Sequence, residues 1–226
     1  MSGAREEILA RIRAATGRQS AQADVDAAYA ALPRGYLRAH HDPAATDIVA
    51  LFAERAADYR AVVEPVAVDT LANAIARAVA ALPPADQSGA GTGHPGIIVP
   101  DGLPAEWIAG LPVGAIVRDD PPLAARELDA ISGVVTGCAV AIAETGTIIL
   151  DHGPGQGRRA LTLVPDFHLV VVRADQIAAD IADALARLDP ARPHTLISGP
   201  SATSDIELIR VEGVHGPRNL HILIAG

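Results

Sequence analysis

Nine residues, DHGPGQGRR at positions 151–159, combine a flexible backbone with two adjacent positive charges. Glycines at alternate positions let backbone N–H groups approach a ligand closely, and arginine forms a planar fork that suits carboxylate or phosphate. The G-x-G-x-G spacing differs from the G-x-G-x-x-G fingerprint of dinucleotide-binding loops, and Pro154 removes one N–H donor. Alone, the segment fits an anion-binding loop and a sharp turn with solvated arginines equally well. Its candidate ligand-binding residues are Gly153, Gly155, Gln156, Gly157, Arg158 and Arg159.

A second segment, SGPSATSD at positions 198–205, is rich in hydroxyl groups. Hydroxyls and backbone amides at the end of a strand suit the oxygens of phosphate or carboxylate, but ordinary capping loops have the same composition. The segment lacks a G-x-S-x-G elbow, which argues against a serine hydrolase. Its candidate ligand-binding residues are Ser198, Gly199, Ser201, Thr203, Ser204 and Asp205.

Glu144 is a candidate catalytic residue because it follows the apolar run CAVAIA (138–143). A carboxylate at the end of a buried strand can act as nucleophile, base or hydrogen-bond acceptor. Burial of an unpaired charge is costly, so an ion pair with a nearby arginine is the structural alternative. Thr145 and Gly146, which continue the turn, are further candidate ligand-binding residues.

His215 is the second candidate catalytic residue, since it lies on a constrained turn between Gly213 and Gly216. It could act as an acid or base, or it could hydrogen-bond the backbone. The chain has eight histidines, and none has the H-E-x-x-H spacing of a zinc site. The sequence therefore predicts no metal site.

Short apolar strands that alternate with amphipathic helices must position these residues. Strands are predicted at 61–66, 96–100, 113–118, 136–143, 147–150, 168–173, 194–199 and 219–226. Helices are predicted at 5–15, 44–59, 69–82 (capped by Asp69), 123–131 and 175–188 (capped by Asp175). The pattern predicts an α/β fold, a Rossmann-like, mostly parallel sheet with helices on both faces.

Two parts of the chain are expected. Residues 1–43 should form an N-terminal helix and an arm that is irregular from residue 17, and residues 44–226 the α/β domain. Residues 83–96 form a predicted Pro/Gly/Ser-rich loop. In parallel sheets, ligands bind where strands end, so the loops after residues 143, 150 and 197 are expected to meet at one edge. The sequence thus predicts a small anion site there.

Composition excludes several functions. A net charge of −9 argues against a nucleic-acid-binding face, and the absence of lysine excludes Schiff-base chemistry and a Walker A loop. The single cysteine, Cys138, can form neither an intrachain disulfide nor an iron–sulfur site. No signal peptide and no membrane-spanning run is visible, so a cytoplasmic protein is expected.

The C-terminal half resembles a known family. The strings TGCAVAIAETGTIILDHGPGQGRRALTLVPDFHLVVVR and ISGPSATSDIELIRVEGVHGPRNLHILI are similar to lactate-utilization protein C, which is built on the LUD domain. The resemblance implies a fold of the NagB/RpiA/CoA-transferase group. It also implies a role with two iron–sulfur partner proteins that oxidise L-lactate to pyruvate. No cofactor is then expected on this chain, and the clusters would reside on the partners.

Three hypotheses remain open from the sequence. The chain could be a non-redox subunit of a lactate-oxidising complex that binds a small carboxylate or phosphate-bearing ligand. It could instead be a free-standing CoA-transferase-like or cyclo-ligase-like enzyme acting on a CoA ester or nucleotide. It could also be a scaffold whose glycine loops serve only the topology. Whether the chain itself catalyses a step is left open.

Overall fold

The computed structural model describes residues 3–16, 22–35, 41, 46–82, 96–203, 211–212 and 216–226. The chain forms two compact units, residues 1–37 and 38–226. The predicted boundary at residue 43 and the predicted loop at 83–96, except residue 96, lie outside the described residues.

The first unit contains two helices, α1 (Gly3–Thr16) and α2 (Gln22–Ala30). The predicted helix at 5–15 is confirmed by α1, none of whose residues is buried. Helix α2 lies in the stretch predicted to be irregular, and that prediction was wrong. Its sequence QADVDAAYA contains four alanines, the residue with the strongest helix propensity.

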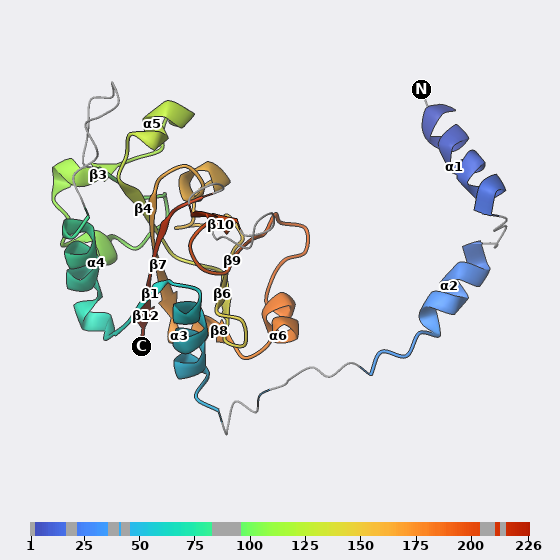
Figure 1. Ribbon diagram of the computed structural model, residues 1–226, viewed down its shortest axis with the longest axis horizontal. Helices are drawn as coiled ribbons and strands as arrows, with labels where there is room; N and C mark the ends of the chain where they lie inside the picture. Colours follow the sequence, from blue (N-terminus) through green and yellow to red (C-terminus); the bar gives the residue numbers. More distant parts are fainter. Residues whose placement is uncertain are drawn as a thin grey trace. The chain divides into compact units, whose positions relative to one another are not determined.

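The second unit is built on a six-stranded sheet with the order β1-β12-β7-β4-β2-β3 (Figure 1). Every pair of neighbouring strands in this sheet runs parallel. The strands are β1 (Val62–Val66), β2 (Ile97–Ile98), β3 (Ile116–Val117), β4 (Gly133–Thr136), β7 (Phe167–Arg173) and β12 (Asn219–Ala225). The predicted α/β fold with a mostly parallel sheet is therefore confirmed.

Helices cover both faces of this sheet, as predicted. On one face, Ile75 of α4 (Leu71–Ala80) packs in the same buried cluster as Val171 of β7. On the other face, Phe52 of α3 (Ile48–Asp58) packs in a cluster with Val170. Figure 1 shows the two helices on either side of β1 and β12.

A second, four-stranded sheet has the order β8-β5-β6-β9 and packs on the same face as α3. Its strands are β5 (Val140–Ile142), β6 (Thr147–Leu150), β8 (Ile177–Ala178) and β9 (Thr195–Ile197). Strand β6 runs antiparallel to both β5 and β9, whereas β5 and β8 are parallel. The tight connection between β5 and β6 imposes this arrangement, since a parallel pair needs a crossover of a dozen or more residues.

The predicted helix at 175–188 is divided in the structure. A 3-10 turn at Ala174–Gln176 precedes β8, and α6 spans only Ile181–Ala186. Asp180, not the predicted Asp175, occupies the N-cap position of α6. Asp69 likewise lies in a 3-10 turn (Val68–Thr70), and Thr70 precedes α4.

The remaining elements are short and lie between the strands of the two sheets. They are α5 (Ala125–Asp129), the 3-10 helices η2 (Ala105–Ile108), η3 (Val113–Ala115) and η4 (Arg159–Thr162), and the hairpin of β10 (Ala202–Thr203) and β11 (Val211–Glu212). Among the described helices, none combines the length and apolar character that a membrane span requires.

His168 lies at the centre of the main sheet, where its Nε2 is 2.8 Å from Oγ1 of Thr136. Burial lowers the pKa of His168 from 6.5 to about 4. As the pH falls below about 6.5, the unfolded chain takes up a proton at this position and the native protein does not. We therefore expect the free energy of unfolding to fall by roughly 3 kcal/mol between pH 7 and pH 4 on account of this residue.

Urea unfolding of the wild type and of His168→Gln, repeated from pH 7.5 to pH 4, measures this effect. The variant is expected to be less stable at neutral pH and to show a shallower pH dependence than the wild type. If the free energy of unfolding depends on pH in the same way for both proteins, His168 does not cause the loss of stability at low pH.

Candidate functional site

The three predicted loops do not meet at one edge, and that part of the prediction was wrong. Since β5 and β6 are antiparallel, the Glu144 turn precedes β6 and the loop at 151–159 follows it, at the opposite end of the strand. The two lie roughly 16 Å apart along the strand, at about 3.3 Å per residue. Strand β9 runs back along β6, so Ser198 returns to the Glu144 end, whereas Thr195 lies at the other end. The predicted residues therefore form two separate groups.

The loop at 151–159 is organised around Asp151. Its Oδ1 accepts hydrogen bonds from the backbone N–H of Gly153, at 3.0 Å, and from Nε2 of Gln156, at 2.7 Å. Its Oδ2 pairs with Nη1 of Arg192 at 2.9 Å. The backbone N–H of Gly155 donates to the carbonyl oxygen of Asp101 at 2.7 Å. The polar groups of Gly153, Gly155 and Gln156 were predicted to bind a ligand. In the structure they form hydrogen bonds that hold the loop in shape.

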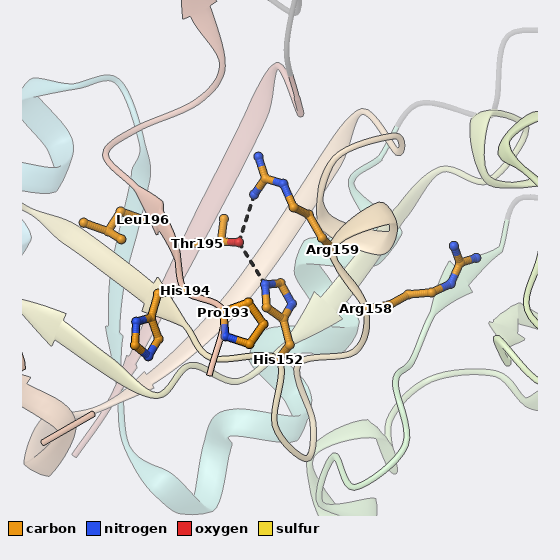
Figure 2. A pocket seen from close by; sticks show the side chains of 7 residues that line it. All are labelled: His152, Arg158, Arg159, Pro193, His194, Thr195 and Leu196. Atoms are coloured by element: carbon orange, nitrogen blue, oxygen red, sulfur yellow. Dashed lines mark hydrogen bonds between the residues drawn. The ribbon is translucent and has the colours of Figure 1, made fainter. Parts of the chain in front are cut away.

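The two adjacent arginines have different surroundings. Arg158 donates from Nε and Nη2 to the two carboxylate oxygens of Asp119, at 2.7 and 2.9 Å, and from Nη2 to the carbonyl oxygen of Leu123. The hydrogen bonds from Arg158 lower the pKa of Asp119. Among the described residues, no carboxylate pairs with Arg159, whose Nη1 donates to Oγ1 of Thr195 at 2.9 Å. Figure 2 shows the two side chains pointing in different directions.

An open pocket of about 500 Å³ lies beside Arg159 (Figure 2). Its lining combines cationic and hydroxyl groups with two histidines: His152, Arg158, Arg159, Pro193, His194, Thr195 and Leu196. It is formed by the loop that follows β6 and by the start of β9, because those two chain segments are antiparallel neighbours. The pocket is therefore built on a pair of hydrogen-bonded strands.

The side chains of Arg159, Thr195 and His152 form a chain of hydrogen bonds in this pocket, which ends at the carbonyl oxygen of Gly157. The Nδ1 of His152 lies 3.1 Å from the carbonyl oxygen of Gly157, which can only accept, so Nδ1 carries the proton. In a neutral ring, Nε2 then accepts from the hydroxyl of Thr195, at 2.9 Å. The same hydroxyl oxygen accepts from Arg159. His152 adopts φ of 57°, a conformation that is uncommon for non-glycine residues and costs about 1 kcal/mol.

The opposite end of β6 carries a row of hydroxyl groups. Oγ1 of Thr147 lies 2.7 Å from Oγ1 of Thr145 and 2.7 Å from Oγ of Ser198. Two glycines of this end pack tightly against α3 and the residue after it. A Cβ atom at Gly146 would lie 2.5 Å from the backbone nitrogen of Ala56, and one at Gly199 would lie 2.7 Å from the carbonyl oxygen of Tyr59.

Glu144 also lies at this end, beside two groups that the sequence did not connect with it. A ligand atom of Glu144, one of His41 and one of Asp180 all lie within 4.8 Å of one another. The sequence predicted no metal site because no histidine has the H-E-x-x-H spacing, and these three residues are far apart in the chain. Asp180 is only 2% exposed, and Glu144 and His41 are half-buried.

The rest of the predicted site lies farther along the chain. Ser201 donates its backbone N–H to the carbonyl oxygen of Pro217, at 2.8 Å, and Thr203 pairs with Val211 in the β10–β11 hairpin. Ser204, Asp205 and His215 lie outside the described residues.

Sequence reasoning missed Thr195, which joins Arg159 to His152. Its position at the start of a predicted strand was visible, but its proximity to the loop depends on the antiparallel pairing of β9 with β6. The single cysteine, Cys138, is buried. Burial raises the pKa of this thiol to about 12.

Comparison with known proteins places these features in a family. A family model described as LUD domain matches residues 115–225. A protein of Deinococcus radiodurans named lactate utilization protein C is 48% identical over 185 residues, which cover 80% of each chain. A lactate utilization protein C of Bacillus pumilus is 36% identical over 92 residues, 37% of this chain and 38% of that protein.

A solved structure is also similar. The crystal structure of a DUF162 family protein from Deinococcus radiodurans has a TM-score of 0.63 and 43% sequence identity. The similarity covers 80% of this chain and 97% of that chain. The span matched by the family model includes Glu144, Arg159 and Asp180.

Proposed function

Because the chain belongs to the LUD-domain family that includes lactate utilization protein C, we propose that it functions in lactate utilization, as a non-redox subunit of an L-lactate-oxidising complex. We further propose that it binds a small carboxylate in the pocket beside Arg159. One observation supports this ligand class. Arg159 lines an open pocket, and no carboxylate of the described residues pairs with it.

The pocket chemistry suits a short hydroxy acid. An arginine guanidinium can bind a carboxylate through two parallel N–H···O bonds, and Arg159 has N–H groups besides the one given to Thr195. The hydrogen bonds to Thr195 hold the guanidinium and the ring of His152 in place before a ligand arrives. Such preorganisation reduces the entropy lost on binding.

Electron transfer is assigned to other chains in this proposal. Oxidation of L-lactate to pyruvate releases two electrons and two protons. The chain's single cysteine is buried, and iron–sulfur clusters require several thiolate ligands. The resemblance noted above supplies the expected acceptors, two iron–sulfur partner proteins, and this chain would bind the substrate or product carboxylate.

Reconstitution tests the subunit role. Lactate-dependent dye reduction is measured with the two iron–sulfur proteins in the presence and absence of this chain, with D-lactate and buffer as controls. We expect dye reduction to require this chain. Equal rates without it would contradict the subunit role.

Binding experiments on the isolated chain test the alternative of a free-standing CoA-transferase-like or cyclo-ligase-like enzyme. Acetyl-CoA and ATP are each titrated into the isolated chain by calorimetry, with L-lactate and pyruvate as the competing candidates. Saturable binding of acetyl-CoA or ATP, without binding of either small acid, would favour the alternative and contradict the proposed ligand class.

A further inference from the structure

We propose that His41, Glu144 and Asp180 form a binding site for a divalent transition-metal ion such as Zn²⁺ or Mn²⁺. The site lies at the opposite end of β6 from the Arg159 pocket and does not depend on the function proposed for that pocket. Its three donor atoms come from three separate segments of the second unit and lie within 4.8 Å of one another.

The register of two parallel strands brings the two carboxylates together. Ile142 of β5 pairs with Ala178 of β8, so the residues two positions farther along, Glu144 and Asp180, emerge side by side. The ladder continues beyond the strands, because the backbone N–H of Glu144 donates to the carbonyl oxygen of Ala179 at 3.1 Å. The backbone under both carboxylates is thus held by hydrogen bonds, at the carboxyl ends of parallel strands where ligands commonly bind.

Asp180 does not serve the local purpose that its position suggests. It occupies the N-cap of α6, where an aspartate side chain normally accepts hydrogen bonds from the first turn of the helix. Its side chain makes no such bond with α6, all of which is described, and the residue is only 2% exposed. Its carboxylate is therefore grouped with Glu144 and His41 instead of capping the helix.

Two carboxylates so close together require positive charge or a proton nearby. Glu144 and Asp180 also take part in other polar interactions of the protein, and an internal ion-pair network is the alternative that the experiment below distinguishes. A divalent cation would satisfy both carboxylates and the imidazole at once. Donors about 2.1 Å from a tetrahedral zinc ion lie roughly 3.4 Å apart, so small side-chain rotations would bring these three into place.

The donor set indicates the class of metal. One imidazole and two carboxylates combine a borderline ligand with hard ligands, a set that suits Zn²⁺, Mn²⁺ or Fe²⁺. Ca²⁺ and Mg²⁺ prefer sites made of oxygen ligands alone. Three protein ligands leave coordination positions for water or a substrate oxygen, as in catalytic zinc sites. Glu144 and His41 are only half-buried, so both residues are partly accessible to solvent.

Calorimetric titration of the full chain tests the site. The protein is treated with a chelator, dialysed and titrated separately with ZnCl₂ and MnCl₂, and its melting temperature is recorded with and without each ion. We expect saturable binding of at least one ion, one per chain, with a higher melting temperature when it is bound. Asp180→Asn, Glu144→Gln and His41→Gln should each weaken that binding at least tenfold.

Two matched variants control for general effects of lost charge. Asp183→Asn alters a carboxylate of α6, the helix that follows Asp180; this carboxylate pairs with Arg187. Glu106→Gln alters an exposed glutamate in η2. Both should bind the ion as the wild type does. If Asp180→Asn does not fold, His41→Gln decides the matter, since this residue lies outside the helices and strands. No saturable binding of either ion, or unchanged affinity in the variants of the group, would overturn the proposal and leave an ion-pair network.

Discussion

Replacing Arg159 with alanine is expected to weaken L-lactate or pyruvate binding about 10- to 100-fold, while the protein stays folded. This magnitude corresponds to the net loss of about one hydrogen bond to a charged group, which is worth roughly 1.5–3 kcal/mol. Arg159 is exposed, and its side-chain bond is to Thr195, so its removal leaves no described carboxylate without its partner. Calorimetry on the isolated chain measures the affinity, and lactate-dependent dye reduction measures the consequence in the reconstituted complex.

Arg158→Ala is the informative comparison, because the two arginines are adjacent and chemically identical. Arg158 is committed to Asp119 and to the carbonyl oxygen of Leu123. Its loss should reduce stability by roughly 1–3 kcal/mol, because the largely buried carboxylate of Asp119 loses its bidentate partner, and should affect ligand affinity far less than Arg159→Ala. Arg173→Ala, at an exposed pair with Asp175, controls for net charge. Equal losses of affinity in the Arg158 and Arg159 variants would contradict the assignment of the ligand to Arg159.

Gly146→Ala is expected to destabilise the second unit by roughly 3 kcal/mol. Gly146 has φ of 60°, which costs other residues about 1–2 kcal/mol. A Cβ atom would also lie 2.5 Å from the backbone nitrogen of Ala56, so the turn and α3 would have to separate. Overpacking of this kind typically costs a further 1–3 kcal/mol. Urea unfolding followed by circular dichroism measures the change.

Gly114→Ala is the matched control, since no atom lies within 4 Å of the Cβ position at this glycine and its φ lies outside the left-handed region. Its free energy of unfolding should stay within about 0.5 kcal/mol of the wild type. A Gly146→Ala protein as stable as the control would show that the Thr145–Gly146 turn does not pack against α3 as described.

Most of the correct predictions rest on patterns among residues that are close together in the chain. The alternation of apolar strands with amphipathic helices specified an α/β fold, and the three-residue turn at Glu144–Gly146 was read correctly between two strands. Local patterns also singled out the loop at 151–159. These features follow from hydrophobic periodicity and composition, which depend on neighbouring residues only.

The tertiary structure decided which of these residues act together. The sequence could not show that β5, β6 and β9 leave the parallel sheet, because strand pairing depends on contacts between distant segments. That pairing separates Glu144 from Arg159 and brings Thr195 to the arginine. The same kind of distant contact distinguishes Arg158 from Arg159, through Asp119.

The grouping of Glu144 with Asp180 and His41 has the same origin. The parallel register of β5 and β8 sets the two carboxylates side by side, although 35 positions separate them in the chain (180 − 144 − 1). By itself, the sequence determined the fold class, the family resemblance and the inventory of reactive side chains. Only the folded chain decided which of those side chains share a site, because proximity between distant residues is a property of strand pairing and not of local composition.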